Sequence, residues 1–155
     1  MLQIALYQPE IAQNTGTLLR TCACLGLHLH IIRPCGYPLS DAKLRRSAMD
    51  YMDQVHFTLH DAWDDFLVAM RGQNKTLVLA TPAASHSFLQ FSFQENHVLL
   101  LGRESDGVPA TVRDACPESL CIPMKPTMRS LNVAISGAMI ATEALRQLKG
   151  FPPIS

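Results

Sequence analysis

The feature that most constrains the fold of this chain is a regular alternation of short apolar runs with segments of helical spacing. Almost continuous apolar strands joined by helical crossovers are typical of a parallel sheet that is covered on both faces. We therefore predict an α/β fold with a mostly parallel sheet and helices on both faces, in a single domain over residues 1–155. The predicted strands are Leu2–Tyr7, Leu27–Ile32, Val55–Leu59, Thr76–Ala80, His97–Leu101 and Leu120–Ile122.

Capping residues and apolar stripes mark the helices between these runs. The first is predicted from about Ile11 to Leu25 and ends at Gly26, a suitable left-handed C-terminal residue. A second follows Ser40–Asp41, either of which can cap it, and a third follows Asp61. The third carries a stripe that predicts a core-facing surface: Trp63, Phe66, Leu67 and Met70.

The last helix is predicted from about Leu131 to Leu148, with Ser130 as its N-cap and Asn132 in its first turn. Its apolar surface is too wide for one sheet contact, so we expect it to pack on a partner subunit as well as on its own sheet. The alternative is a fully buried terminal helix in a monomer. The apolar positions are Ala134, Ala138, Ala141, Leu145, Leu148, Ile135, Met139 and Ile140.

Composition excludes several classes of protein. The longest apolar runs are far shorter than the roughly 20 residues that cross a bilayer, and no basic signal-peptide head opens the sequence, so we expect a cytoplasmic protein.

The 5 cysteines do not form a C-x-x-C pair, and the 6 histidines include no H-x-x-x-H pair, so no metal site is expected. His28 and His30, beside an apolar strand, are interpreted as structural.

Three segments collect polar, Gly and Pro residues directly after predicted strands, where open α/β sheets bind their ligands. They are Pro9–Gly16 with Arg20 beyond it, Gly102–Pro109, and Ile122–Asn132. Each alone could be ordinary scaffold, but together they predict a pocket. Neither the G-x-G-x-x-G fingerprint nor the Walker pattern is present.

The sequence has one basic cluster, Lys43, Arg45 and Arg46, within a chain whose 13 Lys+Arg balance 13 Asp+Glu. A charge run of this kind is usually a solvated helix face. In a dimer, however, it could bind a phosphate backbone together with other cations: Arg20, Lys125 and Arg129.

The three segments, in this order and spacing, resemble the three motifs of SPOUT RNA methyltransferases. The short length, the opening Ile4–Glu10 and the Lys43–Arg46 segment resemble especially the minimal TrmL (YibK) group. Members of that group are tRNA 2'-O-methyltransferases that act on a cytidine or carboxymethylaminomethyluridine at the anticodon wobble position. The resemblance implies a C-terminal trefoil knot, S-adenosylmethionine bent into the knotted loops, and a homodimer whose site combines both subunits.

The resemblance also implies roles for individual residues, carried over by matched position. The cofactor loops are expected to be lined by Ala80, Gly102, Ile122, Ser130 and Leu131. The catalytic positions are expected to be Arg20, Glu104, Ser130 and Asn132. Contacts with RNA are expected from Asn14, Lys43, Arg45, Arg46 and Arg129.

The expected reaction aligns a ribose 2'-hydroxyl with an activated methyl group and assists the loss of its proton. Arg20, with a guanidinium pKa above about 12, is a poor base, so we expect it to orient the hydroxyl and an adjacent phosphate. Three alternatives stay open: methylation at another RNA position, a non-catalytic RNA-binding module of the same fold, and a doubly wound nucleotide-binding oxidoreductase. The missing G-x-G-x-x-G disfavours the last of these.

Overall fold

The computed structural model describes residues 1–40 and 42–155, and its centre is a six-stranded sheet in the order β3-β2-β1-β5-β4-β6. Every pairing between neighbouring strands is parallel, which confirms the predicted sheet. The strands are β1 (Gln3–Tyr7), β2 (His28–Ile32), β3 (Phe57–His60), β4 (Thr76–Ala80), β5 (His97–Leu101) and β6 (Glu118–Leu120). The last strand lies two residues earlier than predicted, and the proline-containing segment after it is irregular.

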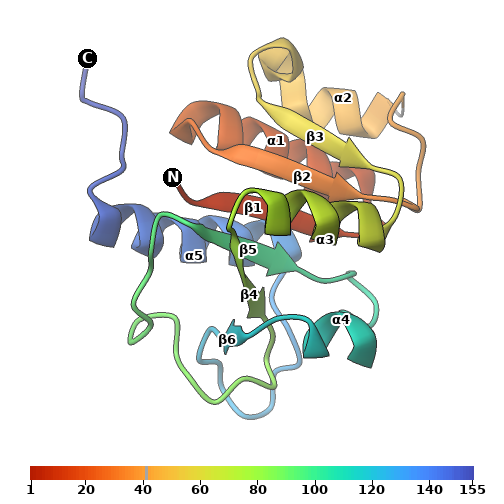
Figure 1. Cartoon of the computed structure of the whole chain (residues 1–155). Coiled ribbons are helices and arrows are strands. Elements are labelled where there is room, and N and C mark those ends of the chain that lie inside the picture. Colours follow the sequence, from red (N-terminus) through yellow and green to blue (C-terminus); the bar gives the residue numbers. More distant parts are fainter. Residues whose placement is uncertain (41) are drawn as a thin grey trace.

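Helices cover both faces of the sheet, as predicted (Figure 1). Leu18 of α1, Leu44 of α2 and Leu145 of α5 belong to the core on one face. Phe66 of α3 and Val112 of α4 belong to the core on the other. The helices are α1 (Ala12–Leu25), α2 (Ala42–Ala48), α3 (Trp63–Gly72), α4 (Ala110–Asp114) and α5 (Val133–Leu148), with a 3-10 helix η1 (Met49–Asp53) after α2.

The expected helix signals are mostly confirmed. Gly26 ends α1 in the left-handed region at φ 66°, and the amide of Leu27 donates to the Cys22 carbonyl over 2.9 Å. In the stripe of α3, Phe66 and Met70 are buried, whereas Trp63 and Leu67 are half-buried. Asp41, one of the two expected caps of α2, lies outside the described residues.

The predicted start of the last helix is wrong. Asn132, not Ser130, is the N-cap of α5, because its Oδ1 accepts hydrogen bonds from the amides of Ala134 and Ile135 at 2.8 and 3.2 Å. These bonds satisfy amides that have no partner inside the helix, and asparagine is among the best residues for this purpose. The helix therefore begins at Val133, and Ser130 lies in the irregular segment before it.

Helix α5 packs closely on β5 and α1. A Cβ atom at Gly137 would lie 2.8 Å from Leu101 Cδ1 and 3.0 Å from Leu18 Cδ2, so only glycine fits there without a shift. Ile140, expected on the wide apolar surface, is buried in this contact. Ile135 and Met139 remain 51% and 39% exposed, which leaves an apolar strip beside the core of the single chain.

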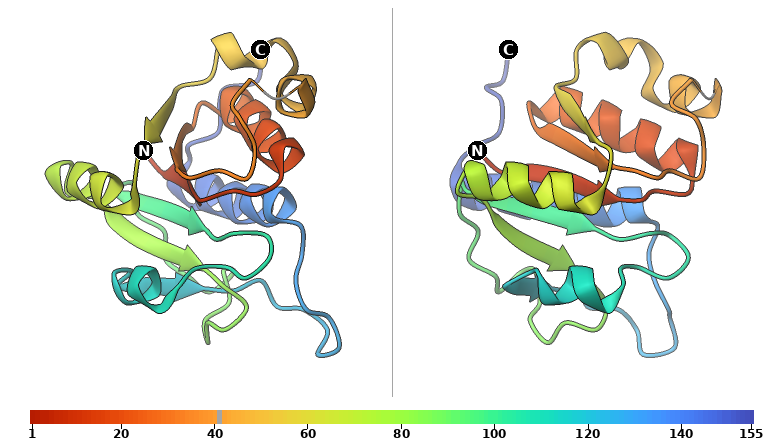
Figure 2. Two further views of the ribbon diagram at one scale, coloured as in Figure 1. Left: turned by 90° about the vertical axis from the view of Figure 1, so that its right-hand side faces the viewer. Right: turned by 45° about the vertical axis from the view of Figure 1, so that its right-hand side comes forward.

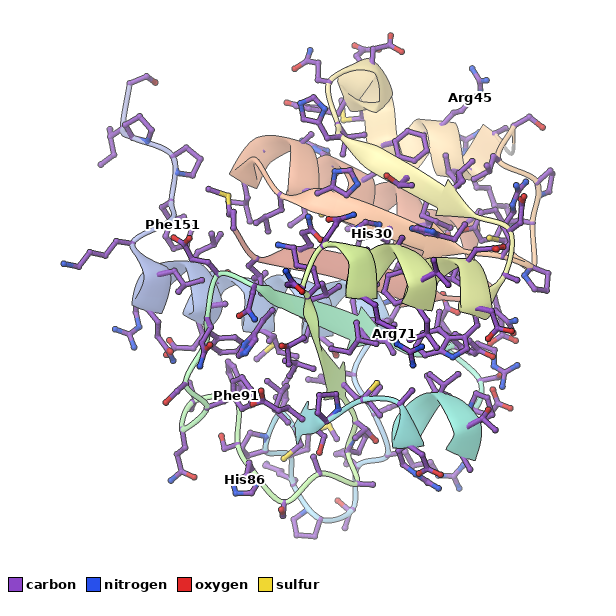
Figure 3. The ribbon with its side chains drawn as sticks, viewed as in Figure 1. His30, Arg45, Arg71, His86, Phe91 and Phe151 are labelled. Atoms are coloured by element: carbon purple, nitrogen blue, oxygen red, sulfur yellow. The ribbon has the colours of Figure 1, made fainter. Side chains whose placement is uncertain are left out.

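A histidine cluster lies between β2 and α3, on the face opposite α5 (Figure 3). His30 is only 3% exposed, and its ring centroid is 5.6 Å from that of Phe66. Its Nδ1 lies 3.0 Å from Nε2 of His60, and its Nε2 lies 3.1 Å from Oε1 of Gln3. Burial, followed by the neighbouring His28 and His60, lowers the pKa of His30 to about 3. His28 and His30, expected to be structural, thus pack together with His60 in one cluster of rings.

We predict that this cluster makes the protein sensitive to acid. The unfolded chain protonates His30 near pH 6.5, whereas the folded chain does so only near pH 3. Between these values the unfolded chain binds more protons, so the free energy of unfolding falls as the pH falls, by about 1.4 kcal/mol per pH unit for each such histidine. Above about pH 6.5 the contribution is constant.

Urea denaturation at several pH values between 5 and 8 measures this slope. His30→Gln should flatten it, while His86→Gln, at an exposed position, should leave it unchanged. An identical slope below pH 6.5 for His30→Gln and the unsubstituted protein would contradict the assignment.

Candidate functional site

The carboxyl ends of β4 and β5, together with the segment after β6, line a cavity of about 690 Å³. In the left view of Figure 2, β4 and β5 lie side by side and end on the same side of the molecule. All three polar segments of the sequence contribute to its lining, through Asn14, Gly102, Glu104, Ile122, Ser130 and Asn132. The predicted pocket is therefore present, at the edge of the sheet where parallel α/β folds place their ligands.

The residues expected to hold a cofactor all line this cavity: Ala80, Gly102, Ile122, Ser130 and Leu131. Ala80 ends β4, Gly102 follows β5, and Ile122 comes shortly after β6, so the strand ends bring them together. Of the residues expected to touch RNA, Asn14 and Arg129 also line the cavity.

Glu104 holds the start of α1. Its carboxylate accepts hydrogen bonds from the backbone amides of Glu10 at 2.8 Å and Ile11 at 3.2 Å. The N-cap of α1, Ile11, has no side chain that can accept a hydrogen bond, and Glu104 from another loop instead binds the amides of this residue and of the one before it. A negative charge at this position also interacts favourably with the helix dipole.

Asn14 connects Glu104 to the start of α5. Its Nδ2 lies 3.4 Å from Oε1 of Glu104, and its Oδ1 accepts a 2.9 Å hydrogen bond from Nδ2 of Asn132. Since Asn132 also caps α5, the hydrogen-bonded chain Glu104–Asn14–Asn132 joins all three polar segments at the cavity wall.

A tight turn brings the second segment back against the first. Arg103 and Gly107 exchange backbone hydrogen bonds of 2.9 and 3.0 Å, and a Cβ at Gly102 would lie 2.7 Å from the Gly107 Cα. The turn directs Ser105 toward Glu10, whose carboxylate accepts from the Ser105 amide at 3.0 Å and from its hydroxyl at 2.7 Å. These hydrogen bonds lower the pKa of Glu10, so that it stays ionised.

Sequence reasoning missed two arginines that line the cavity, Arg103 and Arg113. Arg103 donates to Gln8 Oε1 at 3.3 Å and lies over the ring of Tyr7, 5.4 Å from its centroid. Arg103 follows Gly102 directly within the polar segment Gly102–Pro109, and this position in the sequence could have indicated that it lines the pocket. Arg113 lies on the short helix α4, and nothing in the sequence distinguishes it from an ordinary exposed arginine.

Arg20 is not among the lining residues of the cavity in the described part of the chain. It is exposed on α1, where its Nη1 lies 2.9 Å from Sδ of Met49 and its guanidinium lies 5.5 Å from the centroid of the Tyr51 ring. Asn14 and Arg20 are six positions apart, which places them roughly 9 Å apart along the helix and on different sides of it. Within a single chain, therefore, Asn14 lines the cavity and Arg20 lies away from it.

The basic cluster lies on α2, away from the lining of the cavity. Lys43, Arg45 and Arg46 are exposed, whereas Leu44 between them is buried in the core beside α1. Arg45 projects from the outer side of α2 (Figure 3). The cluster is thus a charged surface on a helix that is anchored in the core through Leu44 and Ala48.

Comparison with known proteins agrees with this arrangement. The model of the SpoU rRNA Methylase family matches residues 1–142. The chain belongs to the SpoU rRNA methylase family. The predicted resemblance to SPOUT RNA methyltransferases is thereby confirmed.

Two relatives match over nearly their whole length, and a third matches over part of it. A tRNA (cytidine(34)-2'-O)-methyltransferase of Ancylobacter novellus is 49% identical over 150 residues, which cover 97% of this chain and 95% of that protein. A solved structure that concerns 2-OH methylation of C/U34 on tRNA has a TM-score of 0.91 and 42% identity, and covers 97% of both chains. The SpoU methyltransferase AviRb from Streptomyces viridochromogenes, solved with AdoMet, has a TM-score of 0.86 at 24% identity, covers 96% of this chain and 61% of its own, and supports the fold.

Neither a metal site nor a membrane-spanning helix is found in the described part of the chain. Within residues 1–40 and 42–155, no group of three or more His, Cys, Asp or Glu side chains could hold a metal ion. In the same residues, no helix is long and apolar enough to span a membrane.

We predict that Asn14→Ala weakens both the fold and the cavity of this SpoU protein. The substitution removes two part-buried hydrogen bonds, one to the Glu104 carboxylate and one from the Asn132 amide, which costs about 0.5 to 1.5 kcal/mol of unfolding free energy for each bond. Affinity for S-adenosylmethionine should fall as well, because the three loops lose their common link. Urea denaturation and titration calorimetry measure the two effects.

Gln13→Ala is the matched control, since Gln13 is the exposed neighbour of Asn14 on the same helix. If both variants showed the same stability and the same cofactor affinity, the hydrogen-bonded chain would not hold the site together.

Proposed function

We propose that this chain is a tRNA 2'-O-methyltransferase that moves a methyl group from S-adenosylmethionine to the ribose 2'-hydroxyl of the wobble nucleotide, a cytidine or uridine. The observation that carries the proposal is the meeting of all three motif segments around one cavity. Relatives named for cytidine(34) methylation, and a solved structure that concerns C/U34, support the choice of nucleotide.

The cavity suits S-adenosylmethionine. Its volume of about 690 Å³ lies within the roughly 300–1,000 Å³ of small-molecule sites. Leu79, Leu101 and Ile140 give it an apolar wall for a nucleoside base, and the loops at Gly102 and Ile122 supply backbone groups. When bound, S-adenosylmethionine supplies a methyl group that is activated by a sulfonium centre. We infer that the knot implied by the resemblance is formed by the loops of this cavity.

The residues of the site divide into positioning and catalytic roles. The Glu104 carboxylate already accepts hydrogen bonds from Glu10, Ile11 and Asn14, so we assign it a positioning role. Asn132, which caps α5, has the same role. Ser130 lines the cavity and offers a hydroxyl to the ribose. Arg20 orients the 2'-hydroxyl and an adjacent phosphate, and the phosphate or a water takes the proton.

This role for Arg20 needs a second subunit. Arg20 lies outside the cavity of its own chain, on α1, which packs beside α5 on the same face of the sheet (Figure 1). The apolar strip of Ile135 and Met139 is exposed, and it is extended by exposed Leu131, which also lines the cavity. A second copy that covers the strip therefore reaches the rim of the cavity. We propose a homodimer in which Arg20 of each subunit completes the site of the other.

The basic residues are assigned to RNA binding. Lys43, Arg45 and Arg46 lie on one exposed helix, and Arg129 lies at the cavity. Since the chain has a formal net charge of zero, a local cluster of this kind must supply the attraction for tRNA phosphates.

The function is tested with the purified protein, S-adenosylmethionine and tRNA that lacks modification. We expect one methyl group on the ribose of the wobble nucleotide, located by mass spectrometry of nuclease fragments. A methyl group on a base, or on another nucleotide, would refute the assigned position. Complete absence of transfer would favour a non-catalytic RNA-binding module.

The same preparation tests the basic cluster. Replacing Lys43, Arg45 and Arg46 by Ala should weaken tRNA binding and make the dependence of log Kobs on log salt shallower, by about 0.7 to 0.9 for each phosphate that the variant no longer neutralises. Arg71→Ala, which removes a cation from α3, is the control and should leave the slope nearly unchanged. An unchanged slope in the triple variant would exclude the cluster from tRNA binding.

We predict that Arg20→Ala lowers single-turnover methylation by at least about 100-fold, without loss of cofactor affinity. Arg20→Lys should recover only part of the rate, because it keeps the charge but loses the bidentate geometry. Near-normal methylation by either variant would refute the role of Arg20.

A mixed dimer tests whether Arg20 acts across subunits. Gly102→Val should abolish the site of its own subunit, because the turn has no room for a Cβ. Co-expression of an Arg20→Ala chain with a Gly102→Val chain should restore activity, since one site per mixed dimer then has an intact cavity and an intact Arg20. No recovery in isolated mixed dimers would show that Arg20 acts within its own chain.

A further inference from the structure

A second cavity, of about 520 Å³, lies beyond the ends of β2 and β3. It is lined mainly by the loop after β2, including Arg33, Pro34, Tyr37 and Pro38, and by Asp61 after β3. This loop lies at the same edge of the sheet as the loop after β5 (Figures 1 and 2). None of the roles assigned so far uses it.

The wall of this cavity is fixed to its surroundings. The Tyr37 hydroxyl donates to the Thr15 hydroxyl of α1. The Gly36 amide donates to the Pro9 carbonyl over 2.9 Å, and the Arg33 amide donates to the His60 carbonyl over 3.0 Å. A loop held at three places is a preformed surface, which lowers the entropic cost of binding a ligand.

The second cavity adjoins the first. Pro9, which accepts from Gly36, precedes Glu10 and Ile11, the two residues whose amides bind Glu104. Ile11 itself lines the cofactor cavity, so a single turn of the first motif separates the two cavities. On its other side the same loop leads into α2, which carries Arg45 and Arg46. The second cavity therefore lies between the methyl-transfer site and the basic cluster.

The chemistry of the lining matches a nucleobase. Pro34, Tyr37 and Pro38 provide ring surfaces, on which bases pack irrespective of sequence. Arg33 and Asp61 form an ion pair at the rim, with side chains that are 44% and 79% exposed. The pair presents a fork of donors beside a carboxylate acceptor, which complements the mixed donor and acceptor edge of a base.

We propose that this cavity binds the base of a nucleotide next to the methylated one, and so positions the target ribose at the cofactor cavity. The inference rests on the proposed function, and it adds a specificity site formed by Arg33, Tyr37 and Asp61. The bound base packs on the ring surfaces, and its edge meets the Arg33–Asp61 pair. The basic cluster on α2 then contacts the phosphates beyond it.

The test combines a protein variant with altered substrates. The variant is Arg33→Ala/Asp61→Ala, which removes an exposed pair and leaves the backbone contacts of the loop in place. The substrates are unmodified tRNA and two tRNAs that lack the base of either the 5' or the 3' neighbour of the target. Arg71→Ala is the matched control for loss of an arginine, and calorimetry with S-adenosylmethionine checks that the cofactor cavity is intact.

For the unsubstituted protein, we expect one of the two abasic tRNAs to lose about 5- to 150-fold in kcat/KM, as expected for one base contact. The double variant should lose a smaller factor on intact tRNA, because the ring surfaces of Pro34, Tyr37 and Pro38 remain. On that abasic tRNA its kcat/KM should equal that of the unsubstituted protein, because the contact between the pair and the base is already absent. The side of the target on which this loss occurs identifies the bound neighbour.

Three outcomes would overturn the inference: full activity of the double variant on intact tRNA, no effect of either missing base, or losses that multiply when variant and abasic tRNA are combined. Failure of the unsubstituted protein to methylate intact tRNA would instead refute the proposed function, and with it this specificity site.

Discussion

The Glu104 carboxylate is the interaction on which the arrangement of the site depends. It receives two backbone amides at the start of α1 and the side chain of Asn14, although these groups lie some 90 positions away in the sequence. The N-cap of α1, Ile11, has no side-chain acceptor of its own, and Glu104 binds the backbone at this residue and at the one before it. The loop after β5 and the start of α1 therefore hold each other in place.

Scaffold and site share the same atoms in this protein. Asn132 caps α5 with its oxygen and donates to Asn14 with its nitrogen, so the cavity wall and the start of the last helix are one structure. The tight turn between Gly102 and Gly107 adds the contact between Ser105 and Glu10. Polar residues that look catalytic in the sequence thus spend much of their hydrogen-bonding capacity on holding loops in place.

The sequence predicts the sheet well because buried parallel strands are continuous apolar runs, which leave a strong local signal. It places β6 and the start of α5 less well. A three-residue strand has little periodicity, and both Ser130 and Asn132 are good N-caps, so only the observed hydrogen bonds decide between them. The expected cofactor-loop residues followed from the motif resemblance and all line the cavity, whereas the partners of Glu104 and the position of Arg20 depend on contacts between distant segments.

The outward position of Arg20, held against Met49 and Tyr51, has a consequence for regulation by abundance. In the proposed assembly, an isolated chain can hold the methyl donor but lacks the group that orients the acceptor. Dilution then lowers the activity per chain. While most chains are monomeric, the concentration of complete sites rises with the square of the chain concentration. A newly synthesised chain would be inactive until it binds a second copy, which limits methylation of hydroxyl groups on other molecules.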